Sequence, residues 1–130
     1  MTTDFRAAAA DITDILGLST PPLAISFHAT AVAGVANYGG THPTATEGGR
    51  TGAVAAGCVF WVKAAERTFG TVAVDHGNCS VGSLTHGFRT LEEVAGNEDV
   101  AALIGAEWVS PDMFPKIPTV SEKPAQVVYG

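Results

Sequence analysis

The sequence predicts an α/β fold of the α+β kind, in which helices pack on a small mixed sheet in a single domain spanning residues 1–130. Three observations lead to this prediction. The chain opens with an amphipathic helical pattern, it carries three short apolar runs with strand character, and helical segments separate these runs. Its residues are 46% hydrophobic and 15% charged, against about 25% charged in typical domains, which is consistent with one buried core.

The N-terminal segment is expected to form a helix over residues 4–16 and then a strand. Thr3 is the expected N-cap and Gly17 the expected C-cap. Two prolines at positions 21 and 22 stop the helix and favour an extended entry into a strand over residues 23–28. The helix has one apolar face because apolar residues recur every three or four positions: Phe5, Ala8, Ala9, Ile12, Ile15 and Leu16.

The middle of the chain combines a loop, a helix and a strand. Residues 29–53 are rich in Gly, Ala and Thr without periodicity, which indicates a long loop that is either functional or mobile. A helix is expected over about residues 56–68, with Cys58 and Trp61 on one face and Lys63 on another. The run GTVAVD, residues 70–75, is the second expected strand.

The rest of the chain predicts short elements. A helix is expected to open at Asn78 or Cys79 and to end near Gly87. Two more helices follow over residues 89–96 and 97–106, with Asn97 as the N-cap of the second. A proline-punctuated connection then leads to a third strand in AQVVYG, residues 125–130. This strand is expected to pair within the chain, or with a second chain, a homodimer partner or the remainder of a larger unit.

Charge and hydropathy exclude several classes of partner. Seven Lys and Arg against thirteen Asp and Glu give a net charge of −6 without a basic cluster, so no nucleic-acid partner is expected. The acidic N-terminal segment does not have the pattern of a signal peptide, and no apolar run approaches the roughly 18 residues of a membrane span. We therefore expect no membrane association and a cytoplasmic location. Paired cysteines there are more often metal-binding or redox-active than structural disulfides.

Cys79 is the first candidate functional residue. It follows an expected strand and opens an expected helix, where backbone N–H groups and the helix dipole favour the thiolate form. Gly82 and Gly87 follow it closely, and glycine inside a short helix is tolerated where a backbone or ligand must come close. The alternative is a buried structural cysteine, since Cys is among the most buried residue types.

Cys58 and His76 extend the candidate site to a metal centre. The spacing His76-x-x-Cys79 places both side chains at one turn, and two thiolates with an imidazole hold zinc or a transition metal. Two cysteines do not fill the four thiolate positions of a usual iron–sulfur cluster, so a dimer would supply the others. Nothing in the spacing alone brings Cys58 next to Cys79, and a disulfide between them is left open.

Three further histidines are weaker candidates. His86 lies two helical turns after Cys79 and on the same face, but it also fits a solvated histidine at a helix C-terminus. His28 ends an expected strand and His42 lies in the Gly-rich loop. For His76 the corresponding alternative is a turn residue whose ring binds backbone. The chain lacks phosphate-binding glycine motifs and the G-x-S-x-G nucleophile elbow.

Two cysteine-bearing segments in this order resemble the bacterial and archaeal family called domain of unknown function 169. The resemblance covers about residues 12–128, and implies that this chain corresponds to the N-terminal half of a typical member with a two-cysteine site at Cys58 and Cys79. It implies no reaction. The matching positions are Leu16-Gly17-Leu18, Pro22, Ala24-Ile25, Cys58, Ala64-Ala65, Gly70, Cys79, Gly82, Gly87 and the P-x-x-V-V pattern of residues 124–128.

The sequence thus leads to three hypotheses about function. The first is a cytoplasmic protein that binds a metal or redox cofactor through Cys58 and Cys79, with His76 as third ligand. The second is an enzyme with Cys79 as nucleophile and His76 as base. The third is a non-catalytic module that binds a small molecule or a partner and contains structural cysteines.

Overall fold

The computed structural model describes residues 2–39, 59–77, 79–107 and 109–130. Its strands are β1 (Ile25–His28), β2 (Phe69–Thr71) and β3 (Gln126–Tyr129). The helices are α1 (Phe5–Leu16), α2 (Val59–Ala64), α3 (Ser80–Thr85), α4 (Leu91–Val94) and α5 (Glu98–Gly105), with 3-10 turns η1 (Ala73–His76) and η2 (Phe114–Lys116). The predicted α/β fold class is confirmed. No helix in these ranges is long and apolar enough to cross a membrane.

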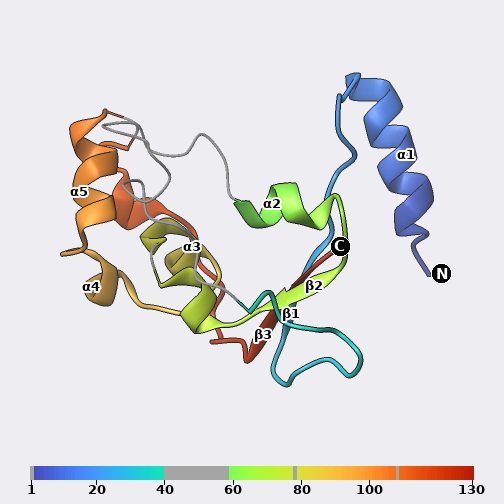
Figure 1. Cartoon of the computed structure of the whole chain (residues 1–130). Coiled ribbons are helices and arrows are strands. Elements are labelled where there is room, and N and C mark those ends of the chain that lie inside the picture. The colour runs from blue at the N-terminus through green and yellow to red at the C-terminus, as the bar shows by residue number, and fades with distance from the viewer. Residues whose placement is uncertain (1, 40–58, 78, 108) are drawn as a thin grey trace.

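The sheet has the order β1-β3-β2, so the strand latest in the sequence lies at its centre (Figure 1). Both ladders are antiparallel, with Tyr129 opposite Ile25 on one side and Phe69 on the other. A parallel bridge between Asn37 and Gly70 adds one pairing beyond the three strands. The third expected strand therefore finds both of its partners within the chain.

Two apolar clusters form the core. The first joins the sheet to α2 through the buried residues Phe60, Ala64, Phe69, Phe88, Val127 and Tyr129. The second lies among α3, α4, α5 and η2 and contains Leu84, Val94, Val100 and Phe114. Helix α3 and the residues just after it connect the clusters, because Leu84 belongs to the second and Phe88 to the first. Burying each of these large side chains contributes about 1.5–3 kcal/mol relative to exposure.

Helix α1 stands apart from the rest of the chain (Figure 1). None of its residues is buried, and its apolar face is open, with Phe5 77% and Ile15 81% exposed. The predicted C-cap is confirmed, since Gly17 has a φ of 60°. The predicted N-cap at Thr3 is wrong. The side chain of Asp4 instead accepts hydrogen bonds from two backbone N–H groups of the first turn, because its carboxylate is one residue closer to them.

The second strand is shorter than predicted. It ends at Thr71, and residues 73–76 form the turn η1 although the sequence GTVAVD has strand-like composition. The Asp75 carboxylate accepts a hydrogen bond from the Val72 N–H at 2.9 Å. This local side-chain bond competes with continued strand pairing and closes the turn. The turn lies directly before α3 and carries His76.

Other predicted boundaries shift by a few residues. The helix expected over residues 56–68 is described from Val59 and ends at Ala64. The sequence predicts a helix that opens at Asn78 or Cys79, and α3 has Cys79 as its N-cap. Asn97 is the N-cap residue of α5, but its side chain makes no capping bond there. It donates instead to the Ser80 hydroxyl at 2.8 Å, which ties α5 to the start of α3.

Candidate functional site

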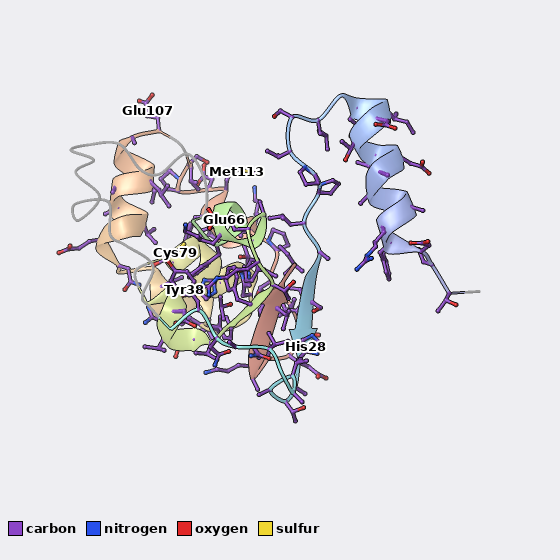
Figure 2. All side chains as sticks on the ribbon, turned by 45° about the vertical axis from the view of Figure 1, so that its right-hand side comes forward. His28, Tyr38, Glu66, Cys79, Glu107 and Met113 are labelled. Carbon is purple, nitrogen blue, oxygen red and sulfur yellow. The ribbon has the colours of Figure 1, made fainter. Side chains whose placement is uncertain are left out.

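The start of α3 holds the Cys79 side chain against the helix backbone. Cys79 has an extended backbone as N-cap, and its Sγ accepts a hydrogen bond from the Gly82 N–H at 3.3 Å. The residue is half-buried, and it lies in the densely packed part of the chain away from α1 (Figure 2). Sulfur is a weak acceptor as a thiol and a much stronger one as a thiolate. This hydrogen bond therefore favours the anion at Cys79.

His76 lies at the end of η1 and is fully buried, at 0% exposure. Its Nε2 is 3.0 Å from the Thr71 hydroxyl oxygen. That hydroxyl donates its only hydrogen to the Val127 carbonyl at 3.4 Å, so towards the ring it acts as an acceptor. In this arrangement the ring carries its proton on Nε2. In the neutral imidazole this leaves the lone pair on Nδ1, which is the nitrogen that can accept a proton or bind a metal.

Gly82 shows that Cys79 and His76 approach one another. A β-carbon added to Gly82 would lie 3.0 Å from the Cys79 Sγ and 3.0 Å from the His76 Nδ1. Both atoms therefore face the same point beside the first turn of α3, and at most twice that distance separates them. The absence of a side chain at Gly82 is what leaves room for the pair. The predicted proximity of His76 and Cys79 is thus consistent with the fold.

His86 lies behind this pair, at the C-cap of α3. Its Nδ1 donates to the Gly82 carbonyl at 2.8 Å, so its Nε2 is the acceptor, and the Tyr129 hydroxyl donates to it. Burial lowers the pKa of His86 below its ordinary value of 6.5, and the hydrogen bond to Gly82 opposes this effect. The ring is 8% exposed and therefore neutral at neutral pH. It is a buried polar residue of the interior rather than the solvated C-terminal histidine of the alternative interpretation.

Aromatic rings enclose the His76 imidazole. Its ring centre lies 4.8 Å from that of Phe60, 5.2 Å from that of Phe88 and 4.8 Å from that of His86. This environment penalises a charged ring, since burying an unpaired charge is costly.

The structure does not bring every predicted site residue together. Cys58, Asn78 and His42 lie outside the described residues. His28 ends β1, where its Nε2 bonds the Ser26 hydroxyl at 2.8 Å, and it takes no part in the His76–Cys79 pair. Within the described ranges, no group of three or more His, Cys, Asp or Glu side chains is arranged to hold a metal ion.

Sequence reasoning missed two residues that orient the site, Thr71 and Tyr129. Thr71 bonds the Nε2 of His76, and Tyr129 bonds the Nε2 of His86. Both lie in runs that the sequence predicts to form strands, residues 70–75 and 125–130. A polar residue at an inward position, such as Thr71 two residues after Phe69, was the available signal for a buried hydrogen-bond partner.

Comparisons of the chain with protein-family models, with curated proteins and with solved structures find no match in any of the three. The resemblance to domain of unknown function 169 therefore stays a prediction. The functional argument depends on the geometry at Cys79 and His76.

Proposed function

We propose that this protein carries out cysteine-dependent chemistry on a small molecule, with Cys79 as nucleophile and His76 as base. One observation carries the proposal: the Cys79 Sγ and the His76 Nδ1 face the same point beside Gly82, each 3.0 Å from it. A thiol within reach of an imidazole acceptor nitrogen is the arrangement that activates a cysteine nucleophile.

The tautomer of His76 supports this assignment of roles. The Thr71 hydroxyl accepts from Nε2–H and so keeps the lone pair of Nδ1 on the side of Cys79. Thr71 corresponds in this respect to the third group that orients the base in nucleophile–base pairs. The Gly82 N–H adds a donor to the sulfur, which favours the thiolate that the proton transfer produces.

The chemical step follows from these positions. The Cys79 S–H proton moves to the His76 Nδ1, and the thiolate forms a bond to an electrophilic carbon of the substrate. The bond between this carbon and its leaving group breaks, and the imidazolium gives the proton to the departing group. Cys79 is half-buried, whereas His76 is screened from solvent.

Alkylation with iodoacetamide, followed by mass spectrometry of the Cys79 and Cys58 peptides, tests the proposal. We expect Cys79 in the native protein to react at least about tenfold faster at pH 7 than in the urea-unfolded chain, because the thiolate is the nucleophile. We expect the substitution His76→Asn to remove this difference. The Cys58 peptide reports general exposure in the same sample. If Cys79 reacts no faster in the native protein than in the unfolded chain, its proposed role as an activated nucleophile is refuted.

A metal or redox-cofactor centre is the second candidate function. The thiolates of Cys58 and Cys79, together with His76, would bind a transition metal. In a dimer they would bind an iron–sulfur cluster. One observation favours it: a histidine that donates one ring N–H to a neighbouring oxygen, as His76 does to Thr71, has the outer-shell bond found behind metal-ligating histidines. Chemistry of this kind fits the cytoplasmic location that we infer from the sequence.

Elemental analysis of anaerobically purified protein distinguishes the two candidates. A metal centre requires a stoichiometric metal that is lost in both Cys79→Ala and Cys58→Ala. The nucleophile hypothesis requires no bound metal and no role for Cys58. Under it, Cys58→Ser should leave the alkylation rate of Cys79 unchanged. Metal retained in Cys79→Ala would exclude Cys79 as a ligand.

A further inference from the structure

A cavity of about 510 Å³ lies at the opposite end of α3 from Cys79. It is bounded by the residues that follow α3, by α4 and by the segment from Pro115 to Lys123. Its volume falls within the roughly 300–1,000 Å³ of small-molecule sites. Neither Cys79 nor His76 lines it, so it is a different site from the one proposed above.

The inner wall of the cavity is apolar. Leu84 and Phe88 line it and are 3% exposed each, and they come from the two different core clusters. Leu91 and Ile117 line it as well and pack against the second cluster. A ligand that enters here contacts aliphatic and aromatic carbon, which favours an apolar body.

The remaining wall is charged. Arg89 and Lys123 line the cavity together with Glu93. Hydrogen bonds from Thr90 lower the pKa of Glu93, and the charges of Lys123 and Arg89 add to this effect, so both cations lie near this carboxylate. Glu93 is nevertheless bound to the Thr90 N–H at 2.7 Å. In the described part of the chain, neither Arg89 nor Lys123 forms an ion pair within 4.0 Å.

We propose that this cavity binds a small organic monocarboxylate with an apolar body. The half-buried Arg89 guanidinium and the exposed Lys123 ammonium are its charge partners, and Leu84, Phe88 and Ile117 contact its carbon skeleton. A guanidinium can bind a carboxylate through two parallel N–H donors. Such a positive site is unusual on a chain whose net charge is −6.

The charges of the wall select a carboxylate over a phosphate. Two cations and one carboxylate leave a local charge of about +1, which a monoanion neutralises. A phosphate dianion would be repelled by the ionised Glu93 and would leave the apolar wall uncovered. A carboxylate with an apolar body matches the charge of one wall and contacts the apolar side chains of the other.

Titration of the ¹⁵N-labelled full chain with 4-phenylbutyrate, followed by two-dimensional NMR, tests the proposal. We expect saturable shifts at the backbone amides of Gly87, Arg89 and Thr90. The neutral analogue 4-phenylbutan-1-ol and inorganic phosphate should each bind at least about tenfold more weakly, since each lacks one of the two matching features. Equal affinity for the butanol or for phosphate, or shifts that do not saturate in the millimolar range, would overturn the assignment.

Charge-removing variants locate the site. Arg89→Gln should weaken 4-phenylbutyrate binding at least about tenfold, while its otherwise unchanged spectrum shows that it folds. Lys116→Gln is the matched control, because Lys116 lies between two residues near the cavity, is exposed and does not line it. Equal weakening by both variants would refute specific binding at Arg89. Cys79→Ser should leave the affinity unchanged, which separates this site from the proposed nucleophile.

Discussion

The hydroxyl of Tyr129 donates a hydrogen bond to the Nε2 of His86 and so joins the central strand to the end of α3, between residues 43 positions apart. Both side chains are buried, and their rings stack with centres 5.7 Å apart. The other ring nitrogen of His86 donates to the Gly82 carbonyl, so the Tyr129 hydroxyl is linked through His86 to the backbone beside the Cys79–His76 pair.

Removing the Tyr129 hydroxyl is expected to destabilise the fold. Tyr129→Phe leaves the His86 Nε2 buried without its donor, which costs about 1–3 kcal/mol. Urea unfolding followed by circular dichroism measures the loss. Tyr38→Phe is the matched control, since Tyr38 packs on the same core cluster and its hydroxyl makes no hydrogen bond within the described residues. Equal losses in the two variants would contradict this role of the Tyr129 hydroxyl.

His86 is expected to make stability depend on pH. Its pKa is lowered in the folded chain, so the unfolded chain binds more protons below the ordinary value of 6.5. The contribution of neutral His86 to the free energy of unfolding should therefore be complete above pH 6.5. It should decrease as the pH falls from 6.5 toward the pKa of His86 in the folded chain. Urea unfolding between pH 7.5 and about 5 measures this.

The variant His86→Gln provides the test of that assignment. It should flatten the pH dependence over this window, apart from any general loss of stability. His28→Gln is the control, because it removes an imidazole that lies at the end of β1 and takes no part in the bond between Tyr129 and His86. If His28→Gln flattens the curve as much as His86→Gln does, His86 is not the titrating group.

Adding one methyl group at Gly82 is expected to disrupt the candidate site. The new β-carbon of Gly82→Ala would lie 3.0 Å from both the Cys79 Sγ and the His76 Nδ1, closer than van der Waals contact allows. The two side chains must separate, and iodoacetamide alkylation of Cys79 should slow several-fold. Gly105→Ala is the control, as its added carbon meets no atom within 4 Å. An unchanged rate in Gly82→Ala would show that the pair does not set the reactivity.

Gly70 is expected to tolerate no side chain. A β-carbon there would collide with the amide of Gln126 and lie 2.8 Å from the Asn37 Oδ1. These two side chains are hydrogen bonded to each other at 2.6 Å, and Gln126 also accepts from the Val32 N–H. Gly70→Ala should therefore cost about 1–3 kcal/mol, as overpacking does. Thermal unfolding measures this, with Gly96→Ala as the open-space control; equal melting temperatures would refute the collision.

Local patterns were enough to predict the start of α3 and the spacing of the two site residues. The spacing of His76 and Cys79 places them at one turn, and the cap at Cys79 follows from a strand, a turn and a helix in succession. Turn η1 was missed because Val72 and Val74 suit a strand, while the capping bond of Asp75 decides the conformation. Composition alone does not reveal whether such a side-chain bond or the pairing of strands is the more stable.

Long-range pairings were beyond local reasoning. The bond between Tyr129 and His86 and that between Thr71 and His76 depend on strand order, which the sequence left open. The approach of Cys58 to Cys79, on which the metal hypothesis depends, concerns a residue outside the described part and stays a prediction. The cavity beside Arg89 forms between segments about 30 residues apart, and no local motif marks it.

The central position of β3 has a consequence for how the protein is made. Strands β1 and β2 bond to β3 and not to each other, so the sheet has no nucleus until residues 126–129 leave the ribosome. Up to that moment Phe60, Phe69 and Phe88 of the first cluster lack Val127 and Tyr129, against which they pack. Such late, non-local pairing slows folding and leaves these apolar side chains exposed during synthesis.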